Sequence, residues 1–200
     1  MTKRKTTAVD NKGVSTIWTI GHSTRTFDEF LSLLTEYGIQ AIADVRSFPG
    51  SRRYPYFGRE ALAETLPSNG IAYHWFQHLG GRRRVNKDSP NTTWRNASFR
   101  SYADYMTTPG FAAGLDELLS YASAQRTAYM CAEAVWWRCH RSMISDALKL
   151  RGIEVIHIID AKHHSEHPYT EPAHVMDGQL TYLEGVGEPL RKEKLGAADA

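Results

Sequence analysis

The pattern of hydrophobic and polar residues changes repeatedly along the chain between one typical of strands and one typical of helices. Short runs of β-branched and aromatic residues indicate strands, whereas apolar residues spaced three or four apart indicate amphipathic helices. The clearest helix begins after Thr26, which has capping-box spacing to Glu29. Its apolar side is marked by Phe30, Leu31 and Leu34. The predicted strands are 15–20, 39–45, 71–76, 127–131 and 154–159, and the predicted helices are 27–37, 58–66, 99–106, 108–119 and 143–152.

The order of these elements predicts the fold class. Strands that alternate with helices favour a mostly parallel sheet with helices on both faces, which is an α/β domain of three layers. Near the C-terminus, residues 174–183 predict a hairpin around a type I′ turn at Asp177-Gly178. No linker or internal repeat interrupts the pattern. We therefore expect one domain over residues 15–187, with flexible tails at 1–14 and 188–200.

Composition narrows the class of protein. The 200 residues are 42% hydrophobic and 23% charged, which is typical of a globular domain and excludes a wholly disordered chain. The mean hydropathy is −0.46, and no apolar run reaches the roughly 18–20 residues that a membrane span needs. The first residues lack the apolar region of a secretory signal. Because two cysteines are too few for a disulfide framework, we expect a cytoplasmic protein.

The net charge of +2 conceals an uneven distribution along the chain. Segments 46–59 and 82–100 interleave arginines with aromatic residues, and segment 160–188 is acidic. Arginines that bind phosphates and aromatic rings that stack on bases are the composition of a nucleic-acid groove. Alternatively, the rings anchor the loops and the arginines are solvated. We expect an anionic ligand, DNA or RNA, bound by Ser23, Arg46, Arg52, Arg53, Tyr54, Arg82, Trp136, Arg138 and Arg141.

Polar side chains follow the predicted strands, at the edge of a parallel sheet where ligands bind. Each has a structural alternative, since Ser23 can cap loop amides and Asp44 can pair with Arg46. Because several strand ends of one sheet carry such residues, we favour a ligand-binding site over these structural roles. The candidates are His22, Ser23, Asp44, Arg46, Cys131 and Glu133.

The densest of these stretches is 131–142, which leads from a predicted strand into a predicted helix. Free amides at a helix N-terminus, together with Arg138 and Arg141, predict an anion site. A strand, loop and helix with Cys131 and an arginine is also the setting of thiol phosphatases and rhodaneses. Those phosphatases place five residues between the two, whereas six lie between Cys131 and Arg138. Cys131 is therefore either a nucleophile or a buried, inert thiol.

Two further assignments concern acid–base and metal chemistry. Glu133 follows the strand and precedes two tryptophans, where a carboxylate can act as a general base or pair with a neighbouring arginine. Cys139 and His140 could be metal ligands together with His157 or with the later histidines. Their spacing matches no closed zinc pattern. We expect no metal or other cofactor, and we expect the histidines His163, His164 and His167 to lie in a solvated loop.

The combination of motifs resembles the DUF488 family over roughly residues 17–182. The resemblance implies a single cytoplasmic α/β domain and no particular activity, but its recurring positions coincide with the strand ends chosen above. The motifs are Thr19-Ile-Gly-His-Ser23, Asp44-Val-Arg46 with Pro49 and Ser51-Arg52, Leu79-Gly-Gly81, Cys131-Ala-Glu133 and Cys139-His140-Arg141.

Together these features predict a hydrolytic enzyme that acts on nucleic acid, for example by removing a damaged or modified base in DNA repair. Asp44 or Glu133 would activate water or stabilise a developing sugar cation, and His22 or His140 would position or protonate the leaving group. One alternative is a thiol enzyme for small anions with Cys131 as its nucleophile. Another is a module that binds nucleic acid or a nucleotide without chemistry.

Overall fold

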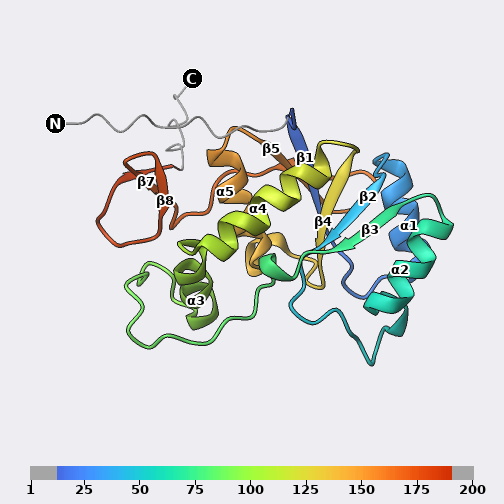
Figure 1. Cartoon of the computed structure of the whole chain (residues 1–200), viewed down its shortest axis with the longest axis horizontal. Helices are drawn as coiled ribbons and strands as arrows, with labels where there is room; N and C mark the ends of the chain where they lie inside the picture. Colours follow the sequence, from blue (N-terminus) through green and yellow to red (C-terminus); the bar gives the residue numbers. More distant parts are fainter. Residues whose placement is uncertain (1–12, 191–200) are drawn as a thin grey trace, which may run out of the picture.

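The computed structural model describes residues 13–190 and is built around a six-stranded sheet (Figure 1). The strand order is β3-β2-β4-β1-β5-β6. The first five strands of this order pair in parallel, and β6 pairs antiparallel with β5 at one edge. The strands are β1 (Thr16–Gly21), β2 (Ala41–Asp44), β3 (Ala72–Trp75), β4 (Thr127–Cys131), β5 (Glu154–Ile158) and β6 (His164–Glu166).

Helices cover both faces of the sheet, which confirms the predicted α/β class. Thr26 and Glu29 form the predicted capping box of α1, and Thr108 caps α4. Pro67, expected to end a helix, lies inside α2, which continues for one more residue. The helices are α1 (Phe27–Glu36), α2 (Arg59–Ser68), α3 (Ala97–Met106), α4 (Pro109–Ala122) and α5 (Arg141–Leu150), with short 3-10 turns η1 (Pro55–Phe57), η2 (Gln77–Leu79) and η3 (Trp136–Arg138). None of the helices within residues 13–190 has the length and apolar character needed to cross a membrane.

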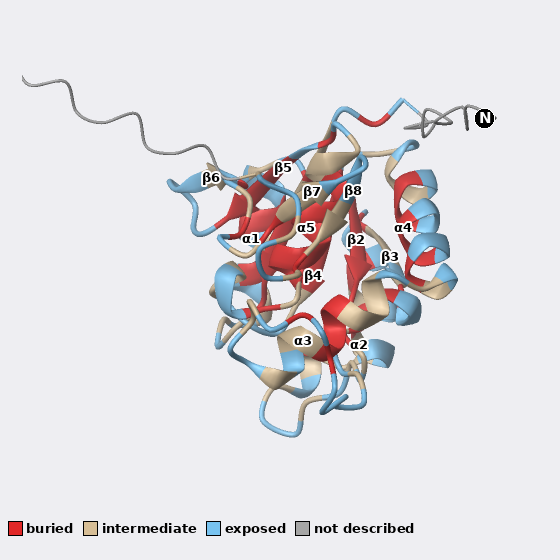
Figure 2. Ribbon diagram, turned by 90° about the vertical axis from the view of Figure 1, so that its left-hand side faces the viewer, coloured by how far each residue is buried: buried red, intermediate tan, exposed pale blue. Residues whose placement is uncertain are grey.

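Two separate hydrophobic cores lie on the two faces of the sheet. Successive side chains of a strand point to opposite faces, so Tyr129 of β4 enters one core and Met130 the other. The core around Met130 is closed by α1 and α2, and the core around Tyr129 is closed by α3, α4 and α5. Figure 2 shows the buried residues gathered on the strands and on the inner sides of the helices. The three layers of the fold follow from this alternation.

A second, smaller sheet contains β7 (His174–Met176), β8 (Gln179–Thr181) and β9 (Glu188–Pro189), in the order β8-β7-β9. Its hairpin turns at Asp177 and Gly178, whose φ angles of 51° and 75° fit the predicted type I′ turn. The prediction of a tail from residue 188 is wrong at its start, because 188–189 form a strand that pairs with β7. The other tail prediction is wrong at Val14, which is buried in the core. Residues 1–12 and 191–200 of these tails lie outside the described part.

The strand order decides where the chemistry lies. Strand β4 is inserted between β1 and β2, although it follows them in sequence by many residues. The pairing continues past the strand ends, since the His22 amide donates to the Cys131 carbonyl at 3.0 Å and the Val45 amide donates to the Met130 carbonyl at 3.0 Å. The segments that follow β1, β2 and β4 therefore leave the sheet side by side at its carboxyl edge.

Candidate functional site

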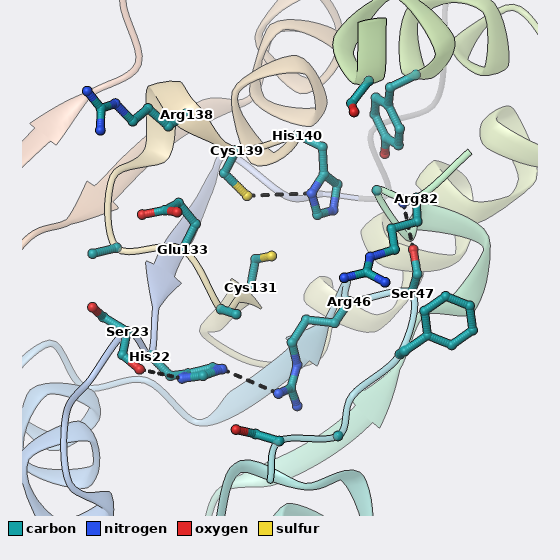
Figure 3. Close-up of a pocket in the computed structure, with 18 of the residues that line it drawn as sticks. His22, Ser23, Arg46, Ser47, Arg82, Cys131, Glu133, Arg138, Cys139 and His140 are labelled. Atoms are coloured by element: carbon teal, nitrogen blue, oxygen red, sulfur yellow. Dashed lines mark hydrogen bonds between the residues drawn. The ribbon is translucent and has the colours of Figure 1, made fainter. Parts of the chain in front are cut away.

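A cavity of about 840 Å³ opens at this carboxyl edge (Figure 3). Its walls come from the segments after β1, β2 and β4, from Gly81 and Arg82 after η2, and from the first residues of α3. The volume is in the range of small-molecule sites. Nine of the residues predicted from the sequence line it: His22, Ser23, Arg46, Tyr54, Arg82, Cys131, Glu133, Arg138 and His140.

Asp44 and Arg46 form a buried ion pair beneath the cavity. Arg46 donates from Nη2 to Asp44 Oδ2 at 2.5 Å and from Nε to Oδ1 at 2.8 Å. Tyr73 donates from its hydroxyl to Asp44 Oδ2 at 2.8 Å, and burial, more than the nearby carboxylate, raises the pKa of this phenol. Asp44 is fully buried and does not line the cavity. The predicted role of Asp44 in activating water is therefore wrong, since both of its oxygens are occupied in holding Arg46.

His22 is held as a neutral imidazole. The ring stacks on Phe57 with centroids 4.1 Å apart, and burial lowers its pKa to about 4. Nδ1 lies 3.0 Å from the Ser23 carbonyl and donates to it, which assigns the unprotonated lone pair to Nε2, 3.4 Å from Nη1 of Arg46. A ring that is neutral at pH 7, with its one N–H bonded to the Ser23 carbonyl, is not placed to protonate a leaving group. His22 instead offers an acceptor nitrogen next to Arg46.

Two thiols and one imidazole meet at another wall of the cavity. Cys139 Sγ lies 3.5 Å from His140 Nδ1, and His140 donates from Nε2 to the Val45 carbonyl at 2.9 Å. The ligand atoms of Cys131, Cys139 and His140 all lie within 4.8 Å of one another. The two thiols affect each other: the neighbouring Cys139 and burial raise the pKa of the Cys131 thiol, and the neighbouring Cys131 lowers the pKa of Cys139. Sequence reasoning joined Cys139 and His140 to His157, whereas the fold joins them to Cys131.

Two glycines allow the segments around the cavity to approach closely. A Cβ atom on Gly21 would overlap the backbone carbonyl of Glu133, and a Cβ atom on Gly81 would overlap the imidazole of His140. Only glycine leaves this space free. The glycines therefore fix the distance between the end of β1 and the loop after β4, and the position of the His140 ring.

Arg141 supports the loop after β4 from below. Its side chain is only 1% exposed, donates from Nη2 to the Glu133 carbonyl at 2.5 Å and from Nη1 to Thr19 Oγ1 at 3.1 Å, and does not line the cavity. The prediction that Arg141 binds substrate is wrong, because the residue lies beneath the cavity lining and both of its Nη atoms donate to the protein's own oxygens. The predicted anion cradle at the start of α5 is also occupied, since the amides of Ser142 and Met143 donate to the carbonyls of Cys139 and His140.

Glu133 lines the cavity and carries a carboxylate without an ion pair among the described residues. The residue is exposed, and its Oε1 accepts a hydrogen bond from the Val135 amide at 3.4 Å. Within residues 13–190 it forms no ion pair, so the predicted alternative of a pair with Arg138 or Arg141 does not hold. It is the one carboxylate among the described residues that line the cavity.

The remaining predicted residues lie outside the cavity lining. Trp136 is half-buried and stacks on His157 with ring centroids 4.2 Å apart. Arg52 and Arg53 are exposed next to the lining residue Ser51. Of the three histidines expected in a solvated loop, His167 is fully buried, since a buried carboxylate provides it with a partner at 2.8 Å.

That carboxylate belongs to Asp146 and is the centre of a buried network that the sequence did not predict. It accepts hydrogen bonds from His167 Nε2 and from the hydroxyls of Thr170 and Tyr182. On its other side, His167 Nδ1 lies 3.0 Å from His157 Nε2. The polar residues of this network are far apart in sequence and carry no common motif. It ties α5, β5 and the C-terminal hairpin together.

Several lining residues were not predicted as part of the site. Ser47 accepts a hydrogen bond on Oγ from the Arg82 amide at 2.7 Å and so joins two loops. Phe48 is 73% exposed, with the Arg82 guanidinium 5.8 Å from its ring centroid. Phe99 lines the cavity from α3. Both phenylalanines belong to the basic and aromatic segments 46–59 and 82–100, so the composition of these segments could have identified them. For Ser47, the sequence offered only its position directly after Arg46.

The fold and the site define a parallel α/β protein with a polar cavity where three strand ends meet. The chain belongs to the DUF488 family: the model described as "Domain of unknown function DUF488" matches residues 26–148. His22 and Ser23 lie just before the matched range. A search of curated proteins and a search of solved structures each gave no match.

Proposed function

We propose that the protein is a hydrolytic enzyme that acts on nucleic acid and accepts one extruded nucleotide in the cavity at the carboxyl edge of the sheet. The observation that carries this proposal is that three arginines and one carboxylate without an ion pair line the same cavity. Arg46, Arg82 and Arg138 come from three different segments and line it together with Glu133. We place this activity in the cytoplasm, in keeping with two free thiols.

The arginines support an anionic substrate. The charge of Arg46 is compensated by Asp44, but Arg82 and Arg138 are exposed and form no ion pair within the described residues. Arginine binds phosphate oxygens in a bidentate manner. A substrate with phosphates on both sides of the cavity would satisfy these two charges, and a polynucleotide chain provides such spacing.

Aromatic rings at the cavity support a base or a sugar as the bound unit. Phe48 and Tyr54 lie on the segment after β2, and Phe99 lies opposite on α3. An exposed ring such as Phe48 offers a face on which a base can stack, which contributes about 1–3 kcal/mol per base. Extruded bases are held between such rings in enzymes that act on single bases.

Glu133 is the residue we assign to the chemical step. A carboxylate without an ion pair can accept a proton from water or stabilise a cationic transition state. The thiol alternative receives less support, because the neighbouring Cys139 and burial raise the pKa of the Cys131 thiol, and the thiolate rather than the thiol is the nucleophile. The N–H groups of His22 and His140 donate to the carbonyls of Ser23 and Val45, which leaves neither of them free to protonate a leaving group.

The test is to incubate the full chain with single- and double-stranded oligonucleotides that carry modified bases, and to score base release and strand cleavage. We expect salt-dependent binding and a product that is absent with Glu133→Gln. Binding without any product would favour the non-catalytic module. Absence of binding at low salt would overturn the proposal.

A further inference from the structure

We propose that Cys131, Cys139 and His140 form a binding site for Zn²⁺, with a fourth coordination position that faces the cavity. The three side chains come from the end of β4 and from the residues just before α5. Figure 3 shows the two sulfur atoms turned toward the same side as the His140 ring. The metal site rests on these residues alone, whereas its use in catalysis also rests on the proposed function.

The separations fit a tetrahedral ion. With Zn–S bonds of about 2.3 Å and a Zn–N bond of about 2.0–2.1 Å, a sulfur and a nitrogen ligand lie about 3.5 Å apart. Cys139 Sγ and His140 Nδ1 are 3.5 Å apart. Two sulfur ligands would lie about 3.8 Å apart by the same bond lengths. No two of the three ligand atoms are more than 4.8 Å apart, so an ion draws them together by about 1 Å at most.

The imidazole is oriented as a ligand before any ion binds. His140 donates from Nε2 to the Val45 carbonyl at 2.9 Å, which leaves the lone pair of Nδ1 directed at the sulfurs. Metal-binding histidines commonly donate their other nitrogen to a carbonyl or carboxylate in this way. Gly81 packs against the ring beside Nδ1, Cγ and Cε1, where a Cβ atom would have no room. Backbone atoms of two other segments therefore hold the ring in place.

The donor set selects the type of ion. Two thiolates and one imidazole suit Zn²⁺, whereas Mg²⁺ and Ca²⁺ prefer oxygen ligands. Two thiolates balance the charge of one Zn²⁺, so the occupied site is electrically neutral beside Arg141. Neutral charge matters here because Cys139 is 5% exposed and Arg141 is 1% exposed.

Three protein ligands leave one position for water, as in catalytic zinc sites, and structural sites normally use four. Within residues 13–190 no further histidine, cysteine or carboxylate belongs to the cluster. Cys131 and His140 both line the cavity, so a water on the ion would lie in the cavity that Glu133 also lines. Zinc lowers the pKa of bound water, and Glu133 would accept the proton that this water loses.

The test uses the reduced full chain, freed of metal by a chelator, and Co²⁺ as a spectroscopic substitute for Zn²⁺. We expect one ion per chain, d–d bands of a tetrahedral ion, and a sulfur-to-cobalt charge-transfer band that Cys139→Ser weakens. His163→Asn, at an exposed histidine outside the cavity, is the matched control and leaves the bands unchanged. Circular dichroism establishes that each variant is folded.

A second measurement needs no variant. Zn²⁺ should protect both thiols of the wild-type chain from iodoacetamide, and a chelator should restore their reactivity. Labelling that is unaffected by Zn²⁺, or a charge-transfer band that is absent, overturns the proposal. If Cys131 and Cys139 form a disulfide again under the assay conditions and so cannot bind Zn²⁺, that result also overturns the proposal. Zinc binding without nucleic-acid binding contradicts only the proposed function, and the reverse result contradicts only the metal site.

Discussion

The imidazole of His140 donates from Nε2 to the carbonyl oxygen of Val45 at 2.9 Å, and this bond links the start of α5 to the end of β2. The two residues are 95 positions apart. The bond fixes which nitrogen of His140 carries the proton, and it brings the Cys139-His140 pair over the strand ends. The geometry of the candidate site depends on this contact. Because Gly81 packs against the same ring, a substitution at Gly81 tests how the position of His140 affects the site.

Gly81→Ala should displace the His140 ring, because the new Cβ has no room beside it. We expect a loss of about 1–3 kcal/mol in the free energy of unfolding. We also expect zinc affinity about 10–100-fold lower, as for changes in the surroundings of a ligand. Urea denaturation and metal titration measure the two effects. Gly50→Ala is the control, since a Cβ at Gly50 meets no atom within 4 Å. Equal behaviour of the two variants would contradict the assigned packing.

Asp44→Asn should destabilise the fold strongly. The change leaves the Arg46 guanidinium, which is 6% exposed, without its counter-charge. Breaking a buried pair in this way costs about 3–5 kcal/mol. Urea denaturation checks this, with Glu60→Gln as the control, because Glu60 pairs with Arg59 at the surface and its loss should change stability little. If the two variants are equally stable, the ion pair does not hold Arg46.

Stability should fall as the pH drops below about 6.5. The pKa of His22 is about 4 in the folded chain and 6.5 when unperturbed, because burial disfavours its charged form. Between these values the unfolded chain binds more protons, so the contribution is complete above pH 6.5 and is lost as the pH falls to about 4. The shift corresponds to a loss of up to about 3 kcal/mol.

Urea denaturation of the wild type and of His22→Gln at several pH values measures this dependence. The variant should show a shallower decline between pH 6.5 and 4, while His78→Gln, at an exposed histidine, should follow the wild type. His157, whose pKa burial lowers to about 2, keeps part of the slope in both variants. Parallel curves for the wild type and His22→Gln would show that His22 is not protected from protonation.

Glu133→Gln should abolish turnover and leave binding intact. Removing a general base typically slows catalysis by about 10²–10⁴-fold. The exposed carboxylate has no ion pair within the described residues, so the change should not alter the melting temperature. Glu64→Gln, at an exposed position of α2, controls for the loss of one negative charge. A variant that turns over at the wild-type rate would move the chemistry away from Glu133.

Arg138→Ala should weaken nucleic-acid binding and its dependence on salt. Each lost phosphate contact lowers the slope of log K against log salt by about 1. Fluorescence anisotropy with a labelled oligonucleotide at several salt concentrations measures this slope. Lys162→Ala removes an exposed positive charge that does not line the cavity, and it should leave the slope unchanged. A slope that is equally affected by both variants would indicate nonspecific attraction only.

Local sequence signals were sufficient for most elements of the fold. The capping box at Thr26 and the turn at Asp177-Gly178 depend on contacts within a few residues, and short runs of β-branched and aromatic residues mark the five central strands. Strand β6 had no such signal, because its three residues form a short edge with two exposed side chains. The burial of His167 was also unpredictable, since its partner Asp146 lies 21 positions away on α5.

By itself, the sequence determined which residues reach the carboxyl edge of the sheet, because motif residues placed directly after predicted strands must leave the sheet there. Only the tertiary structure decided what each of them does. The insertion of β4 between β1 and β2 buries Asp44 and Arg141 as supports, leaves Glu133 facing the cavity, and brings Cys131 to Cys139 and His140. Strand order and burial arise from contacts between distant segments, and the local pattern of residues does not contain them.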